Sequence, residues 1–399
     1  MTLGAKKAHD LGGQPLWLPL VAPPSGVKTE LLRTLWGVPG VYPLSELTAR
    51  TFASGLDTHG DDPSLLHRLR NEVLVLKDFT TVLEMHREER QAILAQLREI
   101  FDGRFDKVWG TGKELHWEGR LGFIAGVTPV IDSYQSVLSV LDERFLMLRV
   151  EQPERKAVAT KALNNAEREP QMREELVAVV QSFMRGLPTT PPKVPHELRD
   201  QLAELADVVT RCRSGVIRDG YRRELDYAPE PEMPARLAKQ LFELLRGVAL
   251  VMGHKEATTT HLDRIKRVAL GCISAVRRTV LRAVARMATV DETLTTTKVA
   301  QGVQYSTATV RRALEDLQAL GVLSVTKGGQ GVPNRWAVRD EWHTALDTLK
   351  EVESALQTRR EETFSETSEG TSHINVSGEQ RFYDEVERLA TEEREEVER

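Results

Sequence analysis

The chain has 399 residues, of which 40% are hydrophobic and 28% charged, so it is long enough for two or three domains with ordinary cores. No apolar run approaches the roughly 20 residues that a membrane span requires. Residues 1–14 also lack the charged and apolar sections of a signal peptide. We therefore expect a soluble, cytoplasmic protein with no membrane partner.

The formal net charge of −5 is unevenly distributed along the chain. The residues from Arg360 onward contain 5 basic and 13 acidic side chains, which leaves the first 359 residues with a net charge of +3. A mildly basic body with an acidic tail is compatible with a nucleic-acid partner but does not require one.

A strand followed by a small-residue loop is predicted near the start of the chain. The strand covers residues 15–21, and Lys28 and Thr29 open the helix that follows the loop. This arrangement aims backbone N–H groups and an ammonium at the phosphates of a nucleotide. The motif G-x-x-x-x-G-K-[ST] would place glycines at Ala22 and Val27, whereas the glycine lies at position 26. The candidate cofactor-binding residues are Pro24, Ser25, Gly26, Val27, Lys28 and Thr29.

Two further buried strands are predicted from short apolar runs. Residues 73–76 are apolar and are followed by Lys77 and Asp78, a pattern that predicts a parallel strand with a carboxylate at the carboxyl edge of the sheet. That carboxylate is either a magnesium-directing acid or a strand-end aspartate with no ligand. The second run, residues 121–127, ends at Thr128, which would lie beside Asp78 if the two strands are neighbours.

A helix and a hairpin are predicted between these two strands. Apolar residues recur at helical spacing over residues 84–101. Alternating segments on either side of the turn at 110–113 then predict a hairpin. Lys113 at its exposed tip is either a solvated turn lysine or a contact to a phosphate backbone. With a last strand near 145–150, the alternation from residue 15 to 150 predicts a three-layer α/β domain with a mostly parallel sheet.

Beyond Pro153 the strand signal disappears for well over a hundred residues, and the segment reads as helical. It is interrupted by a proline-rich linker over 187–195, and a helix is expected from Ala235 to Val251. Two stretches are rich in basic residues, which form either solvated helix faces or a phosphate-facing surface. Their basic residues are Arg211, Arg213, Arg218, Arg222, Arg223, Arg264, Lys266, Arg267, Arg277, Arg278, Arg282 and Arg286.

The pattern changes again after Thr289. A short helix over 294–300, a turn, a helix over 306–317 with Ser306 as its N-cap, and two strands around a glycine-rich tip follow in order. This order closely resembles a winged helix-turn-helix domain, as found in many bacterial regulators and replication ATPases. In such domains the N-terminal residues of the second helix enter the major groove. The implied DNA contacts are Thr307, Thr309, Arg311 and Arg312 on the helix, with Lys327 and Arg335 on the wing.

The charge of this segment leaves a second interpretation open. Between Ala285 and Glu341 there are 7 basic and 6 acidic side chains. A module so weakly basic could serve protein contacts instead of DNA contacts.

Residues 15–290 as a whole resemble the core and lid of an AAA+ ATPase of the type found in phage and mobile-element replication proteins, distantly similar to minichromosome-maintenance helicases. The resemblance rests on the order of the Lys-Thr loop, Leu-Lys-Asp-Phe at 76–79, the hairpin, Glu-Arg-Phe at 143–145 and Pro-Ala-Arg-Leu at 234–237. It implies ATP and Mg²⁺ as cofactors and assembly into a homo-oligomeric ring. Related proteins carry at least a helix ahead of the loop, which implies a shortened version or a separate partner here.

The resemblance also assigns a role to individual residues. Lys28 would bind the β and γ phosphates, Thr29 would ligate magnesium, and Asp78 would be the Walker B acid. Arg144 matches an arginine finger that is inserted into a neighbouring subunit's site, where it stabilises the charge of phosphoryl transfer. The remaining implied roles are Thr128 as sensor 1, Arg236 as sensor 2, and Lys113 on a pore hairpin that touches DNA.

Two positions depart from the family pattern. Val27 is β-branched at a place where the backbone must wrap a phosphate closely. The family strand usually ends in Asp-Glu, whereas this one ends in Lys77-Asp78. Either Asp78 is the metal-directing acid with no glutamate after it, or it takes the glutamate position and the metal acid is missing. ATP binding and ATP hydrolysis are therefore separate expectations.

The expected fold is an α/β three-layer P-loop (AAA+) core with a mostly parallel sheet, an all-α lid and a C-terminal winged helix. The predicted domains are the core at 1–152, the lid and basic helices at 153–288, the winged helix at 289–341, and a helix with an acidic tail at 342–399. The expected function is an ATP-dependent DNA-acting protein, namely a helicase, helicase loader or replication initiator of a phage or mobile element, with a primase as a candidate partner. The alternative is a non-hydrolysing DNA-binding protein or transcriptional regulator in which the core is a scaffold.

Overall fold

The computed structural model describes residues 1–25, 27–56, 62–134, 144–150, 154–219, 225–227, 230–287 and 294–342. These residues form two compact units. Unit 1 comprises Met1–Pro195 and Phe242–His261, and unit 2 comprises His196–Leu241 and the described residues from Leu262 onward. Gly26, Arg222, Arg223, and the helix and tail predicted beyond Trp342 lie outside the described residues.

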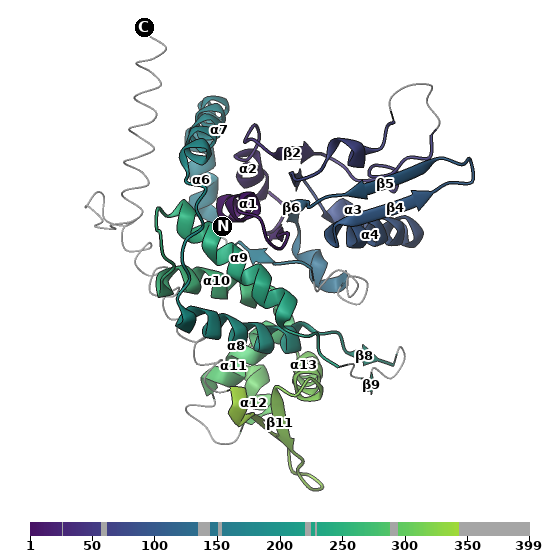
Figure 1. Cartoon of the computed structure of the whole chain (residues 1–399). Coiled ribbons are helices and arrows are strands. Elements are labelled where there is room, and N and C mark those ends of the chain that lie inside the picture. Colours follow the sequence, from purple (N-terminus) through teal and green to yellow (C-terminus); the bar gives the residue numbers. More distant parts are fainter. Residues whose placement is uncertain are drawn as a thin grey trace, which may run out of the picture. The chain divides into compact units, whose positions relative to one another are not determined.

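Unit 1 is built on a five-stranded sheet, whose strands are seen beside their helices in Figure 1. The sheet order is β2-β3-β6-β1-β7, and each neighbouring pair is parallel. Strands β1, β3 and β6 are fully buried, as contiguous apolar runs in a parallel sheet require. The predicted α/β core with a mostly parallel sheet is therefore confirmed. The strand bounds are β1 (Trp17–Val21), β2 (Val41–Leu44), β3 (Val73–Leu76), β6 (Gly122–Val127) and β7 (Leu148–Arg149).

One face of this sheet packs against helices and a hairpin. Trp17 of β1 and Phe123 of β6 share a hydrophobic cluster with Leu97 of α4 (Arg87–Phe101) and Trp117 of the hairpin. The hairpin consists of antiparallel strands β4 (Arg104–Val108) and β5 (Glu114–Glu118), as the alternating sequence predicts. The helix expected over 84–101 begins three residues later, as α4, and a separate short helix α3 (Thr80–Glu84) precedes it. Met85 separates the two helices, because its backbone is extended with ψ of 160°.

The opposite face of the sheet approaches two helices closely. Alternate residues of a strand face opposite sides, so Gly122 and Gly126 of β6 point away from the cluster around Phe123. A Cβ at Gly122 would lie 3.1 Å from His9 of α1 (Thr2–Asp10), and one at Gly126 would lie 3.4 Å from Leu32 of α2 (Lys28–Arg33). Helices therefore cover both faces of the sheet. Helix α1 was not predicted from the sequence.

The remaining elements of unit 1 are short turns and two helices. The 3-10 turns are Leu65–Arg68 and Pro129–Tyr134. Helix α6 (Arg155–Asn165) buries none of its side chains. Helix α7 (Glu169–Gly186) buries Val180 and Met184 against Val38 of the core.

Unit 2 is mainly helical before its winged helix begins. Its helices are α8 (His196–Arg213), α11 (Ala275–Met287) and parts of α9 (Ala235–Val251) and α10 (Thr259–Gly271), within which the boundary between the units falls. The bounds of α9 match the predicted helix. The expectation that well over a hundred residues after Pro153 contain no strand is wrong, because β8 (Ile217–Arg218) and β9 (Leu225–Tyr227) pair as an antiparallel hairpin. Strands of two and three residues are too short to show a sequence period.

The winged helix occupies the end of the described chain. It contains β10 (Leu294–Thr295), α12 (Thr296–Gln301), α13 (Thr307–Ala319), β11 (Leu323–Thr326), β12 (Arg335–Val338) and a 3-10 turn at Asp340–Trp342. Its three strands form a sheet in the order β10-β12-β11. The first helix starts two residues later than predicted, because Leu294 and Thr295 pair with β12 instead.

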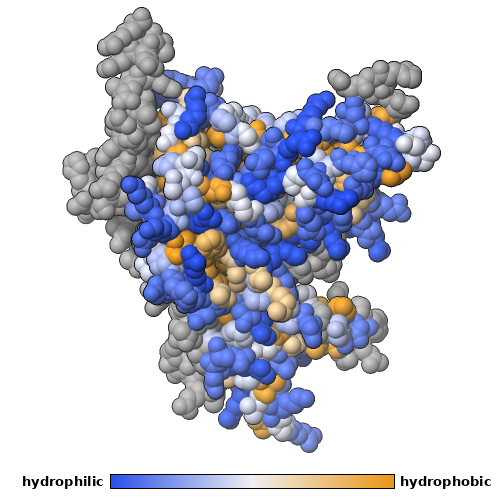
Figure 2. Space-filling view, viewed as in Figure 1, coloured by the Kyte–Doolittle hydropathy of each residue, from blue (hydrophilic) through white to orange (hydrophobic). Residues whose placement is uncertain are grey.

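The side of the molecule drawn in Figure 2 is mostly hydrophilic, with scattered hydrophobic residues. Isolated exposed apolar side chains such as Val108 and Leu163 are normal on protein surfaces. Within the described ranges, no helix has the length and apolar character needed to cross a bilayer.

Candidate functional site

The first candidate site lies at the carboxyl edge of the unit 1 sheet. Strand β6 lies between β1 and β3, so the loop after β1, Asp78 after β3 and Thr128 after β6 emerge from three neighbouring strands. The strands of Asp78 and Thr128 are neighbours, which is the condition under which the sequence places the two residues side by side. The chain continues from β1 to β2 at one edge of the sheet and from β6 to β7 at the other. The crevice between β1 and β6 is thus a topological switch point, the place where such sheets bind ligands.

Thr80 joins Asp78 to Thr128. The backbone N–H of Thr80 donates to Asp78 Oδ1 at 2.8 Å, and the N–H of Thr128 donates to Thr80 Oγ1 at 3.0 Å. The two threonine hydroxyls are 3.3 Å apart. Thr80 was not predicted as a site residue, although an aspartate that accepts from the N–H two residues later is a common local motif that its spacing could have suggested.

Lys28 is enclosed by its own loop. Its side chain is buried, and its ammonium donates to the carbonyl oxygens of Ala22 at 2.5 Å and Pro23 at 2.8 Å. Burial lowers the pKa of Lys28, and the nearby charge of Asp78 opposes this effect. Lys28 and Asp78 are thus close enough to interact, as a phosphate and magnesium site would need. A phosphate would have to replace both carbonyls as the partner of the ammonium.

The other loop residues are more exposed. Pro24, Ser25 and Val27 are exposed, and Thr29 is half-buried at the start of α2. Ser25 has a positive φ of 57°, a conformation that costs a residue with a side chain more than it would cost glycine. Among the residues that the structure describes, no group of three or more His, Cys, Asp or Glu side chains could hold a metal ion. A magnesium ion at Thr29 and Asp78 would therefore take its remaining ligands from phosphate oxygens and water.

The other three cations that the family resemblance singled out are Arg144, Arg236 and Lys113. The side chain of Arg144 is only 6% exposed, pairs with Asp102 at 2.9 Å and lies over the ring of Phe101. A role in a neighbouring subunit would require it to leave both partners. Arg236 lies half-buried in the first turn of α9, within unit 2.

Lys113 is partly buried and does not extend into solvent as the hairpin prediction expected. Its ammonium donates to the carbonyl oxygens of Ser54 and Leu56 and pairs with Asp62 at 3.0 Å. It also lies over the ring of Trp109. A DNA contact would compete with all of these partners.

The second candidate site is helix α13 of the winged helix. Ser306 caps it as predicted, because its hydroxyl accepts from the N–H of Thr309 at 3.2 Å. Thr307, Arg311 and Arg312 are exposed, whereas Thr309 is half-buried with its hydroxyl 3.0 Å from that of Ser306. The opposite side of the helix is buried through Val310, Ala313, Leu314 and Leu317. Three of the predicted DNA contacts, Thr307, Arg311 and Arg312, are therefore exposed on the side opposite the apolar base of the helix.

The wing lies between β11 and β12. Lys327 and Arg335 are exposed, as predicted for side chains that approach a duplex. The N–H of Gly328 donates to Asn334 Oδ1 at 3.2 Å, which closes the base of the turn. Trp336 of β12 donates from Nε1 to Thr296 Oγ1 and so ties the wing to α12.

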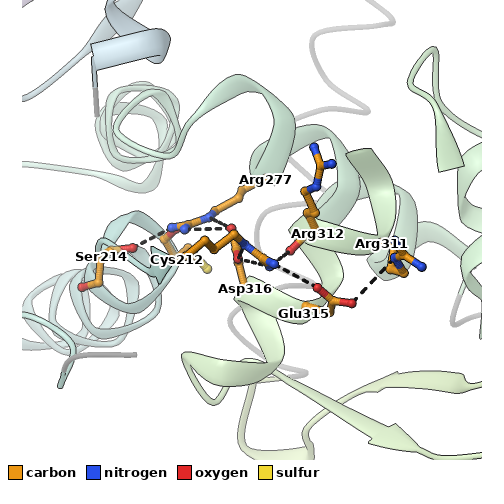
Figure 3. Close-up of polar contacts among 8 residues, drawn as sticks. Cys212, Ser214, Arg277, Arg311, Arg312, Glu315 and Asp316 are labelled. Atoms are coloured by element: carbon orange, nitrogen blue, oxygen red, sulfur yellow. Dashed lines mark hydrogen bonds and ion pairs between the residues drawn. The ribbon is translucent and has the colours of Figure 1, made fainter. Parts of the chain in front are cut away.

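Two arginines from other parts of unit 2 bind the acidic residues of α13, and Figure 3 shows the contacts of one of them, Arg277. Arg277 of α11 pairs with Asp316 at 3.0 Å and donates to the carbonyl oxygens of Cys212 and Ser214. Arg218 of β8 pairs with the same carboxylate at 2.6 Å.

Both arginines are largely buried, with side chains 9% and 13% exposed. The prediction that the basic stretches form solvated or phosphate-facing surfaces is therefore wrong for Arg277 and Arg218. Lys266 is buried as well and pairs with Asp263.

Comparison with protein families matches one segment of the chain, because residues 286–335 fit the model of the DeoR-like helix-turn-helix domain. No match to an AAA+ or helicase family accompanies it. Comparison with curated proteins returns no match. The matched segment runs from the end of α11 through α12 and α13 to the start of β12. The chain therefore carries a C-terminal helix-turn-helix domain similar to the DeoR type, in agreement with the predicted winged helix and with DNA binding.

Proposed function

We propose that this chain is a DNA-binding regulatory protein that docks on duplex DNA through α13 and its wing, with the α/β core as a scaffold. The observation that carries the proposal is the division of α13 into two sides. Arg311 and Arg312 are exposed near its N-terminal end, while the side around Leu314 is buried. A helix of this kind fits the major groove of B-DNA, where arginines bind guanine edges or phosphates.

Replacing both Arg311 and Arg312 by alanine is expected to weaken binding to a mixed-sequence duplex by about tenfold or more, because two phosphate- or base-facing cations are lost. The slope of log K against log salt should fall by about 2, since each phosphate neutralised contributes about 0.9. Fluorescence anisotropy at a series of salt concentrations measures both quantities.

The matched control replaces Arg87 and Arg98, two exposed arginines of α4, by alanine. This variant removes the same charge from unit 1 and should bind as the wild type does. If the two double variants weaken binding equally, the effect reflects net charge, and α13 is not the DNA-binding element.

We propose as a second candidate that the core binds ATP with Mg²⁺, in the manner of the AAA+ proteins that it resembles. The specific observation in its favour is that Lys28, Asp78 and Thr128 lie at one edge of the sheet beside a topological switch point. Lys28 would hold the phosphates, and Thr29 with Asp78 would hold the metal. Hydrolysis would further require that the chains assemble and that Arg144 leaves Asp102 to reach the site of a neighbouring subunit. The helicase, loader and initiator roles all depend on such hydrolysis.

Calorimetric titration with Mg-ATP tests this candidate directly. Lys28→Ala is expected to weaken ATP binding by about 10- to 100-fold, the range for a lost hydrogen bond between charged groups. Lys77→Ala removes an exposed lysine at the same edge and should leave binding unchanged. Absence of binding to the wild type would leave the core as a scaffold only. Equal binding by the two variants would show that Lys28 does not hold the phosphates.

A further inference from the structure

Helix α13 carries its own acidic residues next to the arginines proposed to face DNA. Glu315 and Asp316 follow Arg311 and Arg312 by one helical turn. Side chains three and four positions apart on a helix are neighbours, about 5–6 Å apart at Cβ. This separation is shorter than the screening length of about 8–10 Å at ordinary salt, so both carboxylates would repel nearby phosphates. Alone, the helix offers no net positive charge to DNA.

Arg218 supplies the missing charge from a distant part of the sequence. Its guanidinium pairs with Glu315 at 3.1 Å and with Asp316 at 2.6 Å. Asp316 also pairs with Arg277 (Figure 3), so the two acids have two arginines as counter-charges. The acids are thereby neutralised on the α13 surface.

Arg218 also holds the helix backbone at the proposed DNA contacts. Its Nη2 donates to the carbonyl oxygen of Arg312 at 2.9 Å. In Figure 3 the side chain of Arg312 points away from the acidic pair, while Arg311 lies 3.8 Å from Glu315. Glu315 is thus shared between Arg218 and Arg311. Its contact with Arg218 is the shorter one, and its contact with Arg311 is long and exposed, so Arg311 is only weakly paired.

We propose that Arg218 is a positioning residue for DNA binding, which neutralises Glu315 and Asp316 so that Arg311 and Arg312 meet the duplex without competing acids. This inference rests on the proposed function of α13. It also explains how a segment with nearly equal numbers of basic and acidic residues can bind DNA, because Arg218 and Arg277 lie outside the matched segment.

The test measures binding of a fluorescein-labelled mixed-sequence duplex of about 30 base pairs at about 100 mM salt, where charge effects are large. Arg218→Gln is expected to bind about five- to tenfold more weakly, because Glu315 loses the charge of Arg218 and competes with the phosphates for Arg311. Arg218→Lys keeps the charge and should stay within about twofold of the wild type. The double variant Arg218→Gln with Glu315→Gln should recover most of the lost affinity.

Because the Glu315 side chain is 38% exposed, an unpaired carboxylate there costs little stability, so recovery of affinity reports charge compensation and not repair of the fold. The inference is overturned if Arg218→Gln binds as the wild type does, if the lysine variant is as weak as the glutamine variant, or if the double variant recovers nothing. If Arg218→Gln does not fold, the single variant Glu315→Gln tests the inference. The side chain of Glu315 is 38% exposed, so this variant is expected to fold. It should bind about two- to threefold more tightly, and unchanged or weaker binding overturns the inference.

These results are distinct from failure of the proposed function. A wild-type protein that does not bind the duplex contradicts DNA binding itself. A wild type that binds, with Arg311 and Arg312 needed and Arg218 not needed, contradicts only the role of Arg218.

Discussion

Glu232→Ala is expected to destabilise unit 2 by about 3–5 kcal/mol, the range for removing one partner of a buried ion pair. Glu232 accepts from Arg213 Nε at 2.8 Å and Nη2 at 2.5 Å. The two side chains are only 8% and 3% exposed. Without the carboxylate, the guanidinium loses this counter-charge while it stays inside the unit at the end of α8.

Urea denaturation gives the free energy of unfolding, and hydrogen exchange of peptides from α8 assigns the loss to unit 2. Two-state analysis is applied to each unit separately, since a chain with two units does not unfold in one step by default. Glu230→Ala is the matched control, because Glu230 is exposed in the same segment and its loss should cost less than about 0.5 kcal/mol. Equal effects of the two variants would contradict a special role for the buried pair.

Unit 1 is expected to lose about 3 kcal/mol of stability between pH 6.5 and pH 4 through His9 alone. Burial and the charge of Arg120 lower the pKa of His9 to about 4. Its Nε2 is 3.0 Å from the carbonyl oxygen of Asn71, and its Nδ1 is buried with no hydrogen-bond partner among the described residues. A second proton on the ring would therefore have no acceptor.

The sign follows from which state takes up the proton first. Below pH 6.5 the unfolded chain protonates its histidine while the folded chain keeps His9 neutral, so falling pH favours unfolding until about pH 4. Above pH 6.5 neither state is protonated, and the stabilisation is fully present. The free energy of unfolding measured from pH 7 to pH 4 should show this loss.

His9→Gln should flatten this part of the profile, because glutamine can still donate to Asn71 but does not titrate. His116→Gln is the contrasting control. Hydrogen bonds to Asp106 and Glu114 raise the pKa of His116, so its contribution has the opposite sign and is lost as the pH rises. A profile that keeps its acid slope in His9→Gln would show that carboxylates alone produce the slope.

The sequence was most informative where one residue type dominates a short segment. Strands β1, β3 and β6 are unbroken apolar runs, and such runs are readable because a parallel strand between two helix layers is buried on both faces. Helix α9 and the Ser306 cap could also be predicted, because the signals for a helix and for its N-cap lie in neighbouring residues of the sequence. Helix α1 was missed because it buries Lys6, Lys7 and His9, residues that sequence patterns assign to the surface.

The candidate sites show the same limit. The sequence placed Asp78 and Thr128 at strand ends, but only the strand order shows that they share an edge with the loop of Lys28. The pairing of Arg218 with Asp316 joins residues 98 positions apart. Periodicity and spacing in the sequence do not reveal a contact between residues so far apart. A count of charges within the winged helix alone therefore omits Arg218 and Arg277, which pair with Asp316.

The anchoring of Asp316 has a consequence for how this chain could exchange parts with others. The segment similar to other helix-turn-helix domains begins at residue 286, yet the two arginines that hold Asp316 lie before it, in α11 and β8. A recombination breakpoint at residue 286 would separate α13 from both arginines that pair with Asp316. An exchange that keeps these ion pairs must also transfer β8 and α11. The segment that would have to be exchanged as a unit is therefore longer than the segment that matches the family model.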